Sequence, residues 1–266
     1  MSDADMQDVA RKYGFESAFV LPAPEDSGCD IALRFWVPGH EMEMCGHATV
    51  GSVWLLNQLG MLPGDLLTVW TKSGKVLAHV TGKGADAVQV EISQPQGVVQ
   101  ALSSTQRAEI LDVLGITEDE MLPLPIQNAA TSRVKTLAPL RSVALLDGLK
   151  PDFARMEALC ERIGSTGLYP YAISDDSAGV FDARQFPKAS GYPEDAATGI
   201  AAAALLFGLL QNGQVRAGEG PITVRQGRAM GRPSAINVRF RHDESGKITG
   251  CWLSGSVTME EHNHAH

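Results

Sequence analysis

Two stretches decide the fold: CGHATVGSVWLLNQLG at Cys45–Gly60, and EDAATGIAAAALLFGLLQ at residues 194–211. Each opens with small residues and continues as a run that is apolar on nearly every side, which is typical of a buried helix. Segments rich in aromatic and β-branched residues surround both runs and indicate strands, as at residues 31–37 and 222–226. Strands and helices in this mixture predict an α+β fold.

The two helix starts can be superposed, with Gly46 opposite Gly199 and Cys45 opposite Thr198. Internal repetition of this kind predicts two similar halves, each wrapping strands around one helix, with a cleft where the halves meet. We place the N-terminal half at residues 1–120 and the C-terminal half at residues 121–250. A last strand near residues 251–258 is expected to return to the first half.

Other elements follow from periodicity and turn residues. Helices are expected to end at Tyr13 before Gly14, to run from a Ser104 cap to Leu114, and to span residues 151–163. Further strands are expected at residues 17–21, 68–70, 75–79, 87–92, 132–136, 142–146, 169–174, 180–186, 235–240 and 248–257.

Composition limits the class of function. The 266 residues are 44% hydrophobic and 20% charged, which is ordinary for a folded enzyme. A net charge of -9 without a basic cluster argues against a nucleic-acid partner, and the longest apolar run is too short to cross a membrane. The polar, acidic start is unlike a secretory leader, and four cysteines without paired spacing favour a reduced, cytoplasmic protein.

The two helix starts are the first candidate site. Free backbone N–H groups and the helix dipole attract a carboxylate, and glycine lets a ligand approach the backbone closely. Gly46 and Gly199, with Cys45 and Thr198 beside them, are therefore predicted to bind a small anionic substrate. Close helix packing is the alternative explanation for such small residues.

Three polar residues near these starts carry candidate chemistry. His47 can donate a hydrogen bond to a substrate oxygen, or be a structural histidine. Asp195 can accept a hydrogen bond from substrate, or cap the second helix. Glu16, between Phe15 and Phe19, is expected to be partly desolvated, with a raised pKa suited to proton transfer, or else to be a surface residue. No metal is expected, because Cys45 and His47 lack a second ligand pair at zinc-like spacing.

Four segments taken together resemble one family. RKYGFESAFVL (residues 11–21), LRFWVPGHEMEMCGHATVG (33–51), GYPEDAATG (191–199) and VRQGRAMGRPS (224–234) occur in the order found in the phenazine-biosynthesis PhzF-like isomerases. That family is similar in fold to diaminopimelate epimerase. The resemblance implies two pseudo-symmetric halves, each a strand barrel around a central helix, and a homodimer.

The resemblance also implies roles for matched residues. Glu16 corresponds to the catalytic glutamate that moves a proton between two carbons, and His47 and Asp195 bind and polarise the substrate. Gly46 and Gly199 match the glycines of the two helix starts. No metal or organic cofactor is implied. The best-understood reaction of the family isomerises trans-2,3-dihydro-3-hydroxyanthranilate, a small cyclic acid, in phenazine biosynthesis.

Two departures from the family pattern bear on substrate and fold. The family begins with a strand and a GNP turn ahead of the helix that contains Ala10, and this chain is expected to begin inside that helix. Ile200 stands where phenazine-pathway members have a serine that contacts substrate, and an isoleucine cannot donate that hydrogen bond.

Two rival functions remain. An amino-acid epimerase or racemase of the same fold uses two thiols, but Thr198 stands opposite Cys45, and a hydroxyl is far less acidic than a thiol. A non-catalytic protein that binds small anions is the second rival, and both departures from the family pattern favour it.

Overall fold

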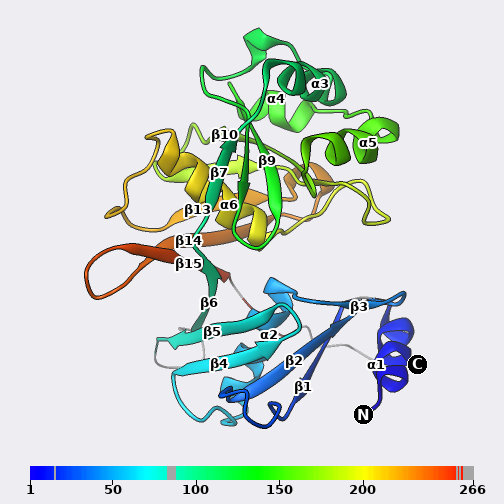
Figure 1. The fold of residues 1–266 in the computed structure, drawn as a ribbon, viewed down its shortest axis with the longest axis vertical. Coiled ribbons are helices and arrows are strands. Elements are labelled where there is room, and N and C mark those ends of the chain that lie inside the picture. Colours follow the sequence, from blue (N-terminus) through cyan, green and yellow to red (C-terminus); the bar gives the residue numbers. More distant parts are fainter. Residues whose placement is uncertain (15, 83–87, 256, 258, 260–266) are drawn as a thin grey trace. The chain divides into compact units, whose positions relative to one another are not determined.

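The structure is a computed structural model that describes residues 1–14, 16–82, 88–255, 257 and 259. The chain forms two compact units (Figure 1). Unit 1 contains Met1–Ile92 and the described residues from Ser254 onward, and unit 2 contains Ser93–Leu253. The chain passes between the units within β6 (Gln89–Pro95) and again within β15 (Ile248–Gly255). The first passage lies at Ile92, whereas the sequence placed it near residue 120.

Unit 1 is a sheet with one central helix and one outer helix. The strands are ordered β1-β2-β4-β5-β6, with β3 paired to β2, and β2 runs parallel to β4 while the other pairs are antiparallel. Helix α2 packs against β1 and β5 and buries Val50, Val53 and Leu56. The elements are α1 (Asp3–Tyr13), β1 (Ser17–Leu21), β2 (Ile31–Trp36), β3 (Glu41–Met42), α2 (Gly46–Gln58), β4 (Leu66–Thr71), β5 (Gly74–Thr81) and β6.

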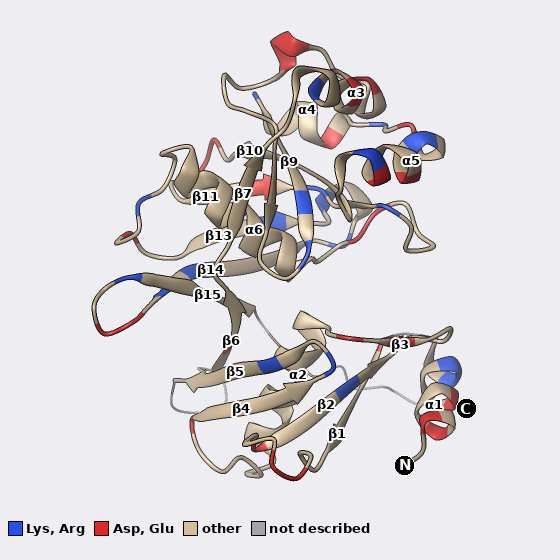
Figure 2. Ribbon diagram, in the orientation of Figure 1, with Lys and Arg blue, Asp and Glu red and all other residues tan. Residues whose placement is uncertain are grey.

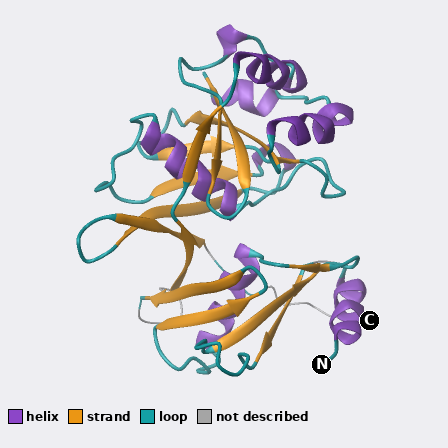
Figure 3. Cartoon of the chain, viewed as in Figure 1, coloured by secondary structure: helices purple, strands orange, loops and turns teal. Residues whose placement is uncertain are grey.

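Unit 2 curls a larger sheet around a second helix. Its strands are ordered β15-β14-β13-β11-β10-β9-β8-β7, with β12 paired to β10. Strands from both ends of this order, β7, β8 and β14, contact α6, so the sheet wraps the helix (Figure 3). The elements are β7 (Val98–Ala101), α3 (Ser104–Leu114), η1 (Glu118–Glu120), β8 (Gln127–Ala130), β9 (Val134–Leu140), α4 (Val143–Gly148), α5 (Phe153–Ile163), β10 (Gly167–Ile173), β11 (Val180–Ala183), β12 (Phe186–Pro187), α6 (Gly199–Gln211), β13 (Ile222–Gln226), η2 (Arg228–Met230), β14 (Ser234–His242) and β15.

Helix α6 shows why the sequence pattern was informative. All nine residues from Ala201 to Leu209 are buried, as a helix that is apolar on every side requires. Helices α3, α4 and α5 lie outside the sheet and form their own apolar cluster with β9 and β10, which includes Ile110, Leu159 and Leu168. The expectation of a helix buried on every side is confirmed for α6 but is wrong for α2, where only Thr49, Val50, Val53 and Leu56 are buried and Leu55 is 40% exposed.

Three expectations about local structure are wrong. Residues 142–146 form no strand: the Ser142 hydroxyl accepts a hydrogen bond from the Leu145 N–H and starts α4. The cap of α3 is Ser103, in a reciprocal capping box with Gln106, and not Ser104. Helix α1 begins at Asp3 behind a Ser2 cap and is not already under way at the first residue.

Smaller shifts concern strand ends. The strand expected at residues 132–136 runs from Val134 to Leu140, and the one expected at residues 180–186 breaks into β11 and β12. The expected strand starts at residue 87, which lies outside the described residues, and the strand that forms is β6.

Charged residues of both signs are interspersed on the outer helices. Figure 2 shows α1, α3 and α5 each carrying acidic and basic residues, so neither sign dominates any one of them. Across the part of the chain that the structure describes, no helix has the length and apolar character needed to span a bilayer.

Candidate active site

The two central helices differ from the others at their first turn. Side chains cap α1, α3, α4 and α5, the caps being Ser2, Ser103, Ser142 and Asp152. At α2 and α6 the cap positions are Cys45 and Thr198, and neither side chain makes a capping hydrogen bond. Their first backbone N–H groups are thus left for water or a ligand, at the positive end of the helix dipole. These are the helix starts that the sequence singled out.

Unit 1 brings three of the predicted residues together. Glu16 lies immediately before β1, and α2 packs against β1, so the first turn of α2 faces it. His47 Nε2 lies 2.7 Å from Glu16 Oε2, and Cys45 Sγ lies 3.5 Å from His47 Nε2. The Thr49 hydroxyl donates a hydrogen bond of 2.8 Å to the Cys45 carbonyl and so fixes the turn. We call Glu16, Cys45 and His47 the unit 1 cluster.

Electrostatics in the unit 1 cluster favour a charged pair. The hydrogen bond with Cys45, followed by that with Glu16, raises the pKa of His47 to about 11. The hydrogen bond from His47 holds the pKa of Glu16 below its ordinary value, and this outweighs the opposing effect of burial. The sequence predicted a raised Glu16 pKa, which is wrong because Glu16 has a hydrogen-bonding cationic neighbour. Phe15, invoked for that prediction, lies outside the described residues.

The unit 1 cluster can be reached by a ligand and offers metal-binding atoms. Solvent reaches 58% of the His47 side chain and 33% of the Glu16 side chain. One donor atom from each of Glu16, Cys45 and His47 lies within 4.8 Å of the others, so the three could hold a metal ion. The sequence argument considered only Cys45 and His47, because Glu16 is distant in the chain.

Unit 2 builds a second cluster around Asp195 and Thr198. The Thr198 hydroxyl donates to Asp195 Oδ2 at 2.5 Å. Gln226 Nε2 donates to the Asp195 carbonyl at 2.7 Å and to Thr198 Oγ1 at 3.1 Å, and Gln226 Oε1 accepts from the Tyr169 hydroxyl at 3.0 Å. Asp195 therefore orders the turn before α6 but does not cap the helix. We call these four residues the unit 2 cluster.

The QG…GRPS segment holds the turn before α6 in place. Gly227 has φ 78°, and a Cβ there would lie 2.2 Å from the Arg232 carbonyl oxygen and 2.9 Å from that of Ala196. Only glycine permits this approach. The Ser234 hydroxyl donates to the Ala196 carbonyl oxygen at 2.7 Å. The sequence matched this segment to a family without giving it a role.

An ion pair anchors the same turn from its other side. Arg184 donates to both carboxylate oxygens of Glu194, at 2.8 and 2.7 Å, and 10% or less of either side chain is exposed. Arg184 Nη1 also donates to the carbonyls of Leu146, Asp147 and Leu149 near the end of α4. Glu194, next to Asp195, thereby ties the turn to α4. Sequence reasoning missed Arg184, Gln226, Tyr169 and Ser234, because their partners lie far away in the chain.

The glycines of the helix starts are closely packed. A Cβ at Gly199 would lie 3.3 Å from Leu253, and one at Gly46 would lie 3.7 Å from Ile92. Packing thus accounts for part of the preference for glycine at Gly199. Ile200, the next residue, is half-buried and offers no hydroxyl to a ligand.

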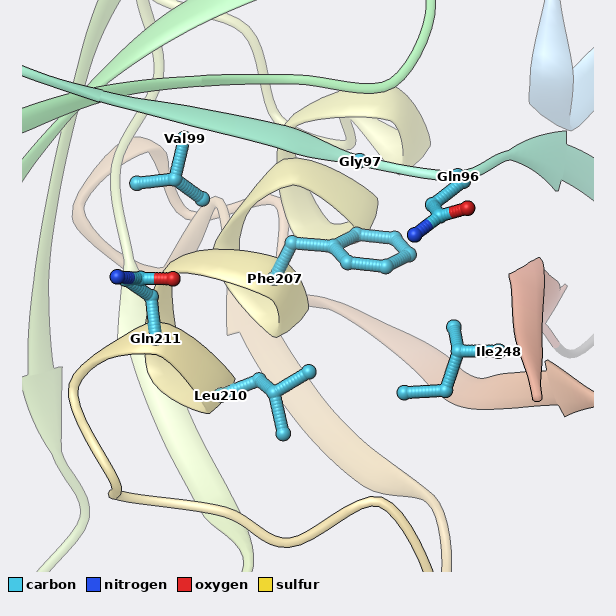
Figure 4. Close-up of a pocket in the computed structure, with 7 residues that line it drawn as sticks. All are labelled: Gln96, Gly97, Val99, Phe207, Leu210, Gln211 and Ile248. Atoms are coloured by element: carbon cyan, nitrogen blue, oxygen red, sulfur yellow. The ribbon is translucent and has the colours of Figure 1, made fainter. Parts of the chain in front are cut away.

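A separate hollow of about 180 Å³ lies at the far end of α6 (Figure 4). Phe207 and Gln211 lie eight and twelve residues after Gly199, the first residue of α6, which corresponds to roughly 12 and 18 Å along a helix. None of its lining residues carries an acid or base, so it offers no proton-transfer chemistry. They are Gln96, Gly97, Val99, Phe207, Leu210, Gln211 and Ile248.

Comparison with known proteins identifies the family of this chain. The family model for phenazine biosynthesis-like proteins, PhzC-PhzF, matches residues 1–261. The chain belongs to the PhzC-PhzF family. An uncharacterized isomerase, YddE of Escherichia coli O157:H7, is 33% identical over 98% of this chain and 88% of its own length. The trans-2,3-dihydro-3-hydroxyanthranilate isomerase of Pseudomonas fluorescens is 30% identical over 88% of this chain and 78% of its own.

A solved structure agrees in fold. The phenazine biosynthesis protein of the PhzF family from Bacillus anthracis has a TM-score of 0.83 at 23% identity, covering 96% of this chain and 86% of that one. The predicted α+β, diaminopimelate epimerase-like fold is confirmed. With relatives named as isomerases across most of its length, this PhzC-PhzF protein is an isomerase.

Proposed function

We propose that this isomerase moves a proton between two carbons of a small cyclic carboxylic acid, with Glu16 as the proton carrier and no cofactor. The observation that carries the proposal is the 2.7 Å contact between Glu16 and His47 beside an uncapped helix start. A carboxylate held ionised at neutral pH can accept a proton from carbon. An imidazolium beside it can donate a hydrogen bond to an oxygen on which negative charge develops.

The step balances without an oxidant or a second substrate. The Glu16 carboxylate takes a proton from a C–H bond, and the electrons of that bond shift a double bond along the ring. The resulting carboxylic acid returns the proton to another carbon, which restores Glu16. When His47 donates to substrate in place of Glu16, the pKa of Glu16 rises toward its ordinary value, which strengthens it as a base at the moment of use.

Asp195 and Thr198 are proposed as substrate-binding groups. Asp195 Oδ2 accepts from the Thr198 hydroxyl, and the remaining lone pairs of the carboxylate can accept from a substrate amine or hydroxyl. Gly46 and Gly199 place free N–H groups where a substrate carboxylate can be bound. Cys45 completes the lining beside His47.

One substrate to examine is trans-2,3-dihydro-3-hydroxyanthranilate, on which the Pseudomonas fluorescens relative is named as acting. Ile200 argues for a different ring substituent in this chain, since it replaces a hydrogen-bonding serine by an apolar side chain. We therefore propose the class of small cyclic acid and treat the phenazine-pathway compound as its first test.

The test follows substrate by proton NMR in deuterium oxide, with wild type, Glu16→Gln and, as a matched control, Glu25→Gln at an exposed position. The expected result is isomerisation by wild type and the control, and a loss of roughly 100- to 10,000-fold in Glu16→Gln. Turnover in Glu16→Gln equal to wild type would refute the role of Glu16.

An epimerase is the second candidate, favoured by the contact between Cys45 and His47. The Thr198 hydroxyl already donates to Asp195, so it is a poor second base opposite Cys45. Loss of activity in Cys45→Ser with activity kept in Glu16→Gln would favour the epimerase. Binding of a cyclic acid that stays unchanged over long incubation would favour the non-catalytic binder.

Assembly and compartment are proposed from the family and the cysteines. Cys29, Cys45, Cys160 and Cys251 are all free thiols, which fits the reducing cytoplasm. A homodimer is expected, and sedimentation equilibrium measures it directly: a mass of twice 28.4 kDa is the expected result.

A further inference from the structure

Lys135 on β9 is a largely buried lysine. Only 5% of the residue is exposed, and its side chain forms no hydrogen bond or ion pair with a residue that the structure describes, whereas its backbone lies opposite Ala129 of β8. Burial, together with the like charge of Arg133, lowers the pKa of Lys135 to about 8, and the negative charge of Asp195 partly opposes this. Buried ammonium groups are rare unless paired, because removing the charge from water is costly.

The sheet register places Lys135 on the face that carries α6. Leu168 of β10 lies beside Thr136 of β9, so Gly167 lies beside Lys135. Side chains two apart on a strand share a face, and Leu137 contacts α6 at Gly208. Lys135 therefore lies on the face that Leu137 and Tyr169 share, and Tyr169 is the member of the unit 2 cluster that reaches Gln226.

A second buried polar group lies against Gly167, the residue that the strand register places beside Lys135. Gln185 is 1% exposed, and neither its Nε2 nor its Oε1 has a hydrogen-bond partner among the described residues. Its Nε2 occupies the space where a Cβ of Gly167 would be, 2.4 Å from that position, so the amide lies directly above the neighbour of Lys135. The Gln185 carbonyl accepts the Asp195 N–H at 3.0 Å, which joins this amide to the turn before α6.

We propose that Lys135 and Gln185 form a subsite for the carboxylate of the substrate, next to Asp195. The ammonium and the amide N–H₂ are donors that a carboxylate would satisfy, and one ligand would complete two groups that the fold leaves unpartnered. This proposal rests on the proposed function and assigns a binding site to the carboxylate of its substrate. It adds side-chain donors to the free N–H groups at the uncapped start of α6.

The proposal predicts that replacing Lys135 raises the stability of the ligand-free protein and weakens ligand binding. A lysine kept for folding would have a partner, and its loss would destabilise unit 2. A lysine kept for a ligand is unfavourable in the empty protein, so replacing it with an apolar side chain of similar size should stabilise the protein and remove binding. A structural role and a ligand-binding role of Lys135 therefore predict changes of opposite sign in the stability of the ligand-free protein.

The experiment compares wild type, Lys135→Met and a control, Lys150→Met, whose lysine is exposed. Affinities are measured by calorimetry for anthranilate and for 2-aminobenzamide, which have the same shape and differ in charge. Wild type and the control are expected to prefer anthranilate by roughly 10- to 100-fold, and Lys135→Met is expected to bind both alike. Thermal unfolding without ligand is expected to show a higher Tm for Lys135→Met than for wild type.

A lower Tm in Lys135→Met, or an unchanged preference for anthranilate, would overturn the proposal. The unfolding measurement needs no ligand, so it tests the proposal even if neither compound binds to the wild-type protein. Glu16→Gln keeps the Lys135-dependent preference while losing proton transfer, so failure of the subsite and failure of the proposed reaction give different results.

Discussion

Replacing Glu194 by alanine should destabilise unit 2 by a measurable amount. Glu194 accepts two hydrogen bonds from Arg184, and at most 10% of either side chain is exposed. Removing one partner of a buried pair costs about 3–5 kcal/mol, because the other charge stays buried. Arg184 keeps its three backbone carbonyl acceptors, so we expect the lower end, about 3 kcal/mol.

Arg184→Met should cost more than Glu194→Ala. It leaves the Glu194 carboxylate unpaired and also removes the donor from three carbonyls, and a buried acceptor left without a donor costs about 1–3 kcal/mol. Glu194→Gln, which keeps one acceptor, should cost about 1–2 kcal/mol. The order Arg184→Met, Glu194→Ala, Glu194→Gln follows from the number of groups that each change leaves unpartnered.

Urea titration followed by circular dichroism measures these free energies of unfolding. Glu157→Ala on the exposed face of α5 is the matched control and should change the free energy by less than about 0.5 kcal/mol. If Glu194→Ala differed from that control by less than about 1 kcal/mol, the pair would not anchor the turn before α6. The reasoning about buried charge would then be refuted for this site.

Two further predictions concern the unit 1 cluster. In His47→Asn, Glu16 loses the hydrogen bond that lowers its pKa, so the acid limb of the pH–rate profile should move up toward the ordinary value of 4.5; an unmoved limb would contradict this. In wild type the Glu16 contribution to stability is present above 4.5 and is lost as pH falls through the lowered folded pKa. Activity should survive dialysis against EDTA, and loss of activity that zinc restores would instead assign Glu16, Cys45 and His47 to a required metal.

The sequence was informative where the deciding information is local. The all-round apolar pattern of residues 200–210 predicted a buried helix, because burial on every face is the only stable environment for it. The sequence prediction failed at residues 142–146, where the Ser142 hydroxyl caps a helix in place of the expected strand. Lys135 reads as an ordinary strand lysine, since its burial comes from α6 and β10, which lie far along the chain.

In the candidate site, too, the sequence revealed the residues but not the contacts that depend on packing. Glu16, Cys45 and His47 were each singled out from sequence, and their contact depends on how α2 packs against β1. The sign of the Glu16 pKa shift was wrong for that reason, since a neighbour 2.7 Å away outweighs burial. Gln226 and Arg184 could have been found only by asking what holds the EDAATG turn, a question that the sequence alone does not raise.

The helix starts differ in whether their backbone N–H groups have hydrogen-bond partners. Four outer helices have side-chain caps, and the described parts of both units are otherwise well bonded at those helix starts. The starts of α2 and α6 lack such caps, and the Gln185 amide has no partner among the described residues, as is true of other buried polar atoms such as Trp36 Nε1 and Asn212 Nδ2. The two helix starts, Lys135 and Gln185 each offer a hydrogen-bond donor to an anion. We propose that a ligand supplies the hydrogen bonds that these donors lack in the empty protein.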